Sequence, residues 1–125
     1  MTAIMLIDDE AEIREIYSEF LRAFGYSVVT ATNGREGVAI HRGDPVDVLI
    51  TDIFMPVQEG IETIMEFRRN FPEVKIIAIS GGGSQGNRDC LTMAKELGAD
   101  AALFKPFSAD ALRDAVKTVL STGSG

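Results

Sequence analysis

Short apolar runs alternate along the chain with stretches in which apolar residues recur at helical spacing. Runs that are apolar throughout are typical of strands buried on both faces of a parallel sheet, and β-branched residues enrich several of them. The predicted strands are residues 3–7, 27–31, 46–51, 75–79 and 101–104. The chain therefore presents five short strands separated by longer segments.

The segments that follow the predicted strands carry the pattern of amphipathic helices. In the first of them, apolar residues recur at i, i+3, i+4, i+7 and i+8: Ile13, Ile16, Tyr17, Phe20 and Leu21. The five predicted helices contain residues 13–24, 34–41, 61–68, 90–97 and 112–120. Glycine or proline is expected to end four of them, and Ser108 is expected to cap the start of the last.

Strands that alternate with helices predict an α/β fold. We expect a doubly wound, five-stranded parallel sheet with strand order 2-1-3-4-5 and helices on both faces, the flavodoxin-like arrangement. Residues 1–121 are expected to form one domain, and 122–125 a flexible tail or the start of a linker. This order puts the ends of strands 1 and 3 beside the topological switch point, where such folds bind ligands.

Charge and composition narrow the choice of partners. The net charge of -7 argues against binding of nucleic acid or of an anionic membrane through this domain. The single cysteine excludes an internal disulfide and favours a reducing compartment. No apolar run is long enough to cross a membrane, and the N-terminus turns acidic too soon for a signal peptide. These features predict a cytoplasmic domain.

Side chains that can carry chemistry stand where the predicted strands end. Asp8 and Asp9 follow the first strand, Asp52 the third, Ser80 the fourth and Lys105 the fifth. Each has an ordinary alternative explanation: an acid can cap a helix, as Asp9 and Glu12 would in a capping box, a serine can satisfy a turn, and a lysine can be solvated. Because all of them fall at carboxyl ends of strands, we expect them to meet at one edge of the sheet.

Three carboxylates at one edge predict a site for a hard cation. Their repulsion should raise the pKa of at least one of them when no cation is bound. Mg²⁺ prefers oxygen ligands and takes few carboxylates, so it suits such a site. With negative charge screened, Asp52 could attack phosphorus, while Ser80 and Lys105 could stabilise the transferred group.

Three other features receive a structural interpretation. His41, the only histidine, is expected at a solvated helix end, and Cys90 is expected as a small core residue on a helix face. Glycines 81–83 resemble a phosphate-binding loop, but they follow the fourth strand and no Lys-Ser/Thr pair closes them. None of the three is expected to carry the chemistry.

At the residues of the sheet edge, the chain resembles the receiver domain of two-component response regulators over nearly its whole length. The matching motifs are Ile7-Asp8-Asp9-Glu10, Asp52 with Met55-Pro56 and Gly60, Ser80-Gly81, Gly98-Ala99 and Lys105-Pro106-Phe107. The resemblance implies that a histidine kinase or histidine phosphotransfer protein donates a phosphoryl group to Asp52. It implies a phosphoacceptor that assists its own phosphorylation and its slow dephosphorylation, rather than a turnover enzyme.

The resemblance also assigns roles at the site. Asp9 and Asp52 would ligate Mg²⁺ directly, together with the main-chain carbonyl of Phe54, and Asp8 would act mainly through water. Ser80 would move toward the acyl phosphate, and Lys105 would pair with it. The face of the fourth helix, fifth strand and fifth helix would bind a downstream protein effector.

The chain departs from the family where many receivers carry an aromatic switch, since Ala102 stands there. Phe104 or the glycine-rich loop after Ser80 could replace that switch. Three rival functions stay open: a phosphatase of the haloacid-dehalogenase type, a flavodoxin-like cofactor binder, and a receiver that only binds proteins. Phe54, where the first rival needs an acid, argues against it. Acids after the first strand argue against the second, and the complete set of phosphorylation residues argues against the third.

Overall fold

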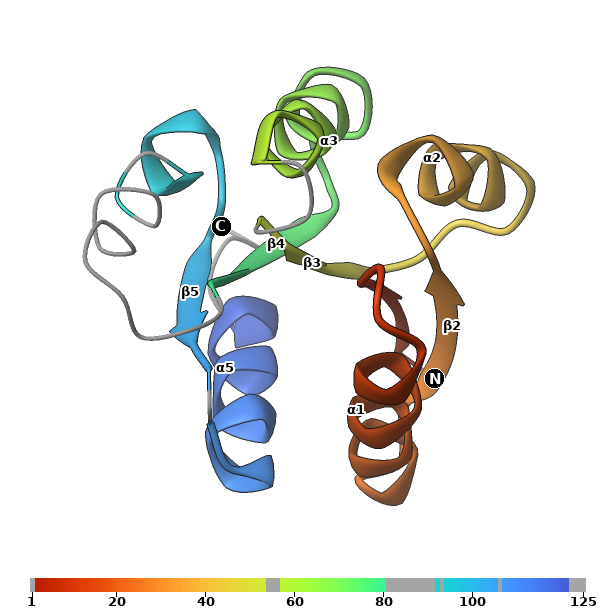
Figure 1. Ribbon diagram of the computed structural model, residues 1–125, viewed down its shortest axis with the longest axis vertical. Helices are drawn as coiled ribbons and strands as arrows, with labels where there is room; N and C mark the ends of the chain where they lie inside the picture. Colours follow the sequence, from red (N-terminus) through yellow and green to blue (C-terminus); the bar gives the residue numbers. More distant parts are fainter. Residues whose placement is uncertain (1, 54–56, 81–91, 93, 106, 122–125) are drawn as a thin grey trace.

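The fold is a single parallel sheet between two layers of helices (Figure 1). The computed structural model describes residues 2–53, 57–80, 92, 94–105 and 107–121. Its strands are β1 (Ala3–Ile7), β2 (Ser27–Ala31), β3 (Val48–Asp52), β4 (Lys75–Ser80) and β5 (Ala101–Phe104). They pair in parallel in the order β2-β1-β3-β4-β5, which confirms the predicted topology.

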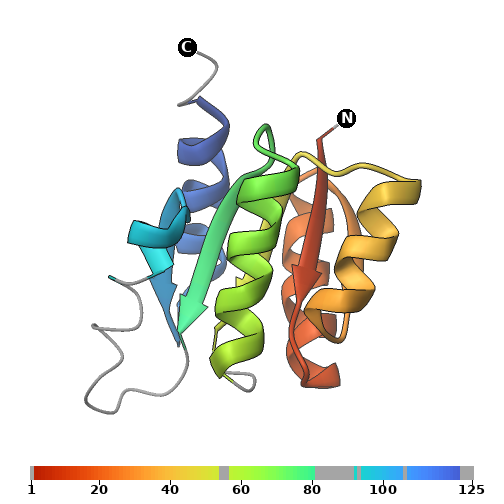
Figure 2. The same cartoon turned by 90° about the horizontal axis from the view of Figure 1, so that it is seen from above.

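Helices cover both faces of the sheet, as predicted. The labelled helices are α1 (Ala11–Ala23), α2 (Gly34–Gly43), α3 (Val57–Asn70) and α5 (Ala109–Ser121). In Figures 1 and 2, α1 and α5 lie on one face and α2 and α3 on the other. Residues 92 and 94–97 are also helical, whereas Cys90 lies outside the described residues. Within the described ranges, no helix is long and apolar enough to cross a membrane.

The core consists of two apolar layers, one on each face of the sheet. Met5 and Ile7 of β1 pack in the layer beneath α2 and α3, while Ile4 and Leu6 pack in the layer beneath α1 and α5. Since successive side chains of a strand point to opposite faces, both sets must be apolar when both faces are covered. This is why the sequence of the strand is apolar at every position.

Helix ends follow the expected signals in part. The Ser108 hydroxyl accepts a hydrogen bond from the Ala111 N–H at 3.0 Å, as predicted. The capping box of Asp9 and Glu12 is wrong, because the N-cap of α1 is Glu10 and it makes no side-chain cap hydrogen bond. A cap that the sequence analysis did not identify is Asn33, whose Oδ1 accepts from the Glu36 N–H at 2.8 Å.

The start of α3 also differs from the prediction. We expected a loop through Gly60, but the helix begins at Val57 and Gly60 lies in its first turn. A Cβ at Gly60 would stand 2.7 Å from the Ile53 Cα, so this glycine is required by close packing of α3 on the end of β3. Packing here overrides the low helix propensity of glycine.

His41 is buried, so its expected place at a solvated helix end is wrong. Its side chain is 3% exposed, and its Nδ1 accepts a hydrogen bond from the Val46 N–H at 3.1 Å. The ring lies 4.3 Å from the Phe71 ring and 5.5 Å from the Phe67 ring, measured between centroids. The imidazole is therefore a core group that closes the connection between α2 and β3.

Burial of His41 predicts a loss of stability in mild acid. Burial lowers the pKa of His41 in the folded protein, with the charge of Glu73 opposing the shift. The unfolded chain then binds a proton at a higher pH than the folded chain, so the free energy of unfolding falls as pH decreases below about 6.5. The difference in the free energy of unfolding between the wild type and His41→Gln, measured by urea unfolding, should narrow on acidification. A constant difference would contradict this.

Candidate functional site

The predicted residues do meet at the carboxyl edge of the sheet. Asp8 follows β1, Asp52 ends β3, Ser80 ends β4 and Lys105 follows β5. The sheet ladder fixes their separation, since Ser80 pairs with Phe104 and the Lys105 N–H donates to the Ser80 carbonyl at 2.8 Å. The side chains of Asp8, Asp52 and Ser80 are buried.

One ammonium group joins two of the carboxylates. The Lys105 Nζ lies 2.8 Å from Asp52 Oδ2 and 3.2 Å from Asp8 Oδ2. Burial by itself lowers the pKa of Lys105, but the hydrogen bonds and charges of Asp52 and Asp8 outweigh it, so the net shift is upward. Lys105 is therefore a firmly charged cation at the centre of the site.

The surroundings of Asp8 raise the pKa of its carboxyl group. Its pKa is raised to about 6, first by burial and then by the nearby charge of Asp52, while the Glu10 N–H and Lys105 oppose the rise. The expectation that one carboxyl would have a raised pKa is confirmed. Burial contributes more than the carboxylate repulsion on which the expectation was based.

The carboxylates that could hold a metal ion lie at the start of α1. Oxygen atoms of Asp8, Asp9 and Glu10 lie within 4.8 Å of one another, with Asp8 buried and the other two exposed. Glu10 was not among the predicted ligands, although its place in an acidic triplet was a signal for it. Phe54, whose carbonyl was a predicted ligand, lies outside the described residues, and Asp52 is paired with Lys105.

Ser80 ends β4, which pairs with β3, the strand that ends at Asp52. Ser80 is fully buried, and its Oγ has no hydrogen-bond partner within the part of the chain that the structure describes. A buried hydroxyl without a partner is costly. The Ser80 hydroxyl can donate a hydrogen bond and accept one.

Tyr17 of α1 and Phe107 form an aromatic pair near the site. The rings of Tyr17 and Phe107 stack with centroids 4.7 Å apart and planes 20° apart. Burial is the main reason why the pKa of Tyr17 is raised, and the charges of Lys105, Asp8 and Asp52 also act on it. The sequence analysis placed Tyr17 only in the core, and the contact with Phe107 depends on the fold.

The residue at the aromatic-switch position, Ala102, is small and half-buried. Ala102 packs against the core layer of α2 and α3, whereas Phe104 is 45% exposed at the end of β5. Whether Phe104 replaces the switch stays a prediction. The glycine-rich loop that was the other candidate lies outside the described residues beyond Ser80.

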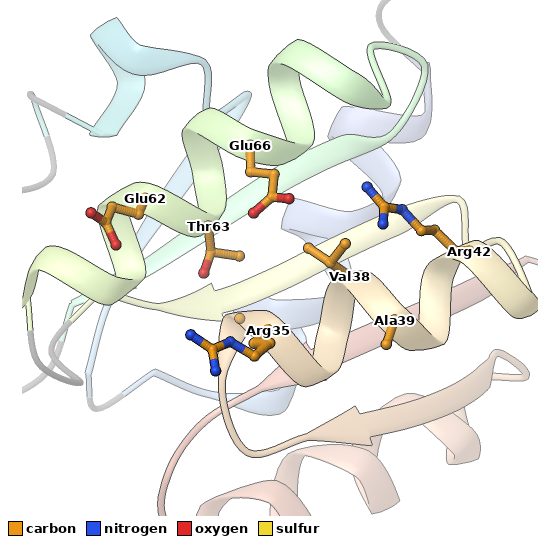
Figure 3. Close-up of a pocket in the computed structure, with 8 residues that line it drawn as sticks. Arg35, Val38, Ala39, Arg42, Glu62, Thr63 and Glu66 are labelled. Carbon is orange, nitrogen blue, oxygen red and sulfur yellow. The ribbon is translucent and has the colours of Figure 1, made fainter.

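A hollow elsewhere on the surface offers no comparable chemistry. It has a volume of about 410 Å³ and lies between α2 and α3 (Figure 3). Arg35 and Arg42 line it together with Glu62 and Glu66. Because both charge signs are present in equal number, the hollow favours neither anions nor cations.

Known sequences show the family to which the chain is related. A family described as "Response regulator receiver domain" matches residues 4–117. The probable transcriptional regulator ycf27 of Guillardia theta is 37% identical over 94% of this chain and 44% of its own length. The transcriptional regulatory protein CpxR of Klebsiella pneumoniae is 33% identical over 96% of this chain and 50% of its own length. The chain spans about half the length of these curated relatives.

Solved structures with a similar fold belong to the same family. A response regulator receiver domain protein of Clostridium thermocellum has a TM-score of 0.87 at 30% identity, covering 96% of this chain and 94% of that one. The chemotaxis protein CheY4 of Vibrio cholerae has a TM-score of 0.84 at 30% identity, covering 95% of this chain and 98% of that one.

Proposed function

The chain belongs to the response regulator receiver domain family of two-component systems, and from this premise we propose that it is a phosphorylation switch with Asp52 as the acceptor. The donor is the phosphohistidine of a histidine kinase or of a histidine phosphotransfer protein. The observation that carries the proposal is the pairing of the buried Asp52 carboxylate with Lys105, with Ser80 at the end of the neighbouring strand.

The transfer forms one bond and breaks another. An oxygen of Asp52 attacks phosphorus, the phosphorus–nitrogen bond of the donor breaks, and its electron pair returns to the imidazole. Lys105 supplies positive charge and Ser80 a hydrogen bond to the phosphoryl oxygens. The phosphoryl group stays on this chain until water removes it, so the protein is an acceptor rather than a turnover enzyme.

Magnesium is the cofactor that suits the donor atoms at this edge. Asp8, Asp9 and Asp52 would hold it, together with the main-chain carbonyl of Phe54. All of these ligands are oxygen atoms, and carboxylate oxygens of Asp8, Asp9 and Glu10 lie within 4.8 Å of one another. When bound, Mg²⁺ would neutralise negative charge on the acceptor and on the phosphoryl group.

The partners follow from the same proposal. A kinase or phosphotransfer protein would dock at the carboxyl edge, and a protein effector would bind the face of residues 92–97, β5 and α5. Phe104 contributes exposed apolar surface to β5 on this face. The acidic net charge argues against nucleic acid or an anionic membrane as a ligand of this domain.

Mass spectrometry of the intact protein tests the acceptor. After incubation with acetyl phosphate and Mg²⁺, the wild type should gain one phosphoryl group, and Asp52→Asn should gain none because it has no carboxylate to attack phosphorus. Asp44→Asn, which removes an exposed carboxylate before β3, should behave as the wild type. Omission of Mg²⁺ should suppress the adduct.

An adduct that persists in Asp52→Asn would contradict the assignment of the acceptor. If the wild type forms no adduct, binding of Mg²⁺ and of beryllofluoride is measured next. Failure of both would favour a module that only binds proteins.

A further inference from the structure

The Arg14 side chain binds the acidic turn, which consists of Asp8, Asp9 and Glu10. Arg14 lies at the end of the first turn of α1, and its Nη1 donates to the main-chain carbonyl of Asp8 at 2.7 Å. That carbonyl belongs to the peptide that joins Asp8 to Asp9. Its orientation therefore decides the direction in which Asp9 leaves the end of β1.

Other hydrogen bonds complete the turn. The Glu10 N–H donates to Asp8 Oδ1 at 2.9 Å, and the Asp8 N–H donates to the Ala31 carbonyl at 3.2 Å. The Arg14 N–H donates to the Glu10 carbonyl at 3.1 Å. Arg14 is thus bound to both ends of the acidic turn, by its main chain at Glu10 and by its side chain at Asp8.

We propose that Arg14 is a positioning residue for the cation site, holding the turn of Asp8, Asp9 and Glu10 in the geometry that binds Mg²⁺. This inference rests on the proposed function. Groups that orient metal ligands typically contribute 10–100-fold to metal affinity. A turn that lost this contact would have to be ordered at the moment of binding, which weakens affinity.

The positive charge of Arg14 should weaken Mg²⁺ binding, whereas its positioning contact should strengthen it. This difference in sign makes the inference testable. A guanidinium near a cation site repels the cation, so removing its charge should strengthen Mg²⁺ binding if charge were its only effect. Removing a positioning contact should weaken binding. The sign of the change distinguishes the two roles.

Arg22 is a matched control on the same helix. Its Nη2 donates to a main-chain carbonyl, that of Val28, at 3.3 Å. Arg14 and Arg22 both line a hollow of about 300 Å³ that also touches Thr30 of β2. The two arginines share charge, helix and type of contact, but Arg22 lies two turns further from the acidic residues.

Calorimetric titration of the metal-free protein with Mg²⁺ tests the inference. We expect about tenfold weaker binding in Arg14→Gln, and binding as tight as or tighter than that of the wild type in Arg22→Gln. Faster hydrogen exchange of the Glu10 amide in Arg14→Gln, without metal, is a second expected result. If Arg14→Gln does not fold, Arg14→Lys is measured for both quantities, and each should move in the same direction by a smaller factor.

Arg14→Gln binding Mg²⁺ as tightly as Arg22→Gln would overturn the inference and leave the proposed function intact. A wild type that binds no Mg²⁺ would overturn both.

Discussion

Lys105→Met should lower the free energy of unfolding of the metal-free protein by about 3–5 kcal/mol near neutral pH. The ammonium contacts Asp52 and Asp8 at 2.8 and 3.2 Å, and the side chains of all three are largely buried. Methionine replaces most of the volume but none of the charge. Two buried carboxylates would then face each other without a cation.

The pH dependence identifies the cause of that loss. The pKa of Asp8 is raised to about 6 in the folded wild type, so between its unfolded pKa of 3.8 and this value the folded protein binds more protons. The contribution of Asp8 to stability therefore falls as pH rises through that window. Without Lys105 the pKa of Asp8 should rise further, because the ammonium charge opposes the rise in the wild type, so the deficit of the variant should shrink on acidification.

Urea unfolding at neutral pH and below the pKa of Asp8 measures both effects. Lys117→Met, at an exposed position of α5, removes the same charge and should change stability by less than about 0.5 kcal/mol. A Lys105→Met variant as stable as this control would rule out the buried ion pair, as would a deficit that grows in acid.

Gly60→Val should cost about 3 kcal/mol, the upper end of the range for overpacked sites. A Cβ at Gly60 would lie 2.7 Å from the Ile53 Cα and 3.0 Å from the Asp52 carbonyl oxygen. Both neighbours are main-chain atoms, so no side-chain rotation can relieve the contact. The helix and the strand must move apart, which also displaces the acceptor residue.

Gly43→Val is the control for this substitution. Gly43 ends α2, and a Cβ there would meet nothing within 4 Å. Valine at this position should change stability by about 0.5 kcal/mol at most. Thermal and urea unfolding of the two variants give the comparison. Equal losses of stability would contradict the close contact between α3 and the end of β3.

The sheet and its functional edge could be predicted because they depend on local pattern and on a simple rule of topology. An apolar run followed by an acid marks a buried strand and its end, and parallel order brings those ends together. Asp8, Asp52, Ser80 and Lys105 were all found in this way. Their separation did not need to be known for their grouping to be expected.

Other features depend on contacts between distant segments. For these features the local sequence predicted a different environment. Gly60 reads as a loop residue in sequence, but a close approach to β3 places it inside a helix. His41 reads as polar and exposed, but Phe67, Phe71 and the Val46 N–H give it a buried environment. The contact of Arg14 with the Asp8 carbonyl depends on a main-chain atom, which no side-chain pattern reveals.

The hydrogen bond between the Lys105 N–H and the Ser80 carbonyl gives the two residues a shared main-chain frame. Their side chains differ in chemistry, but because of this hydrogen bond a shift of one main chain at the sheet edge should also move the other. A movement of the end of β4 that brought the Ser80 hydroxyl toward Asp52 would therefore re-aim the Lys105 ammonium at the same time. The main chain of the sheet edge thus couples the positions of two side chains that belong to the same site.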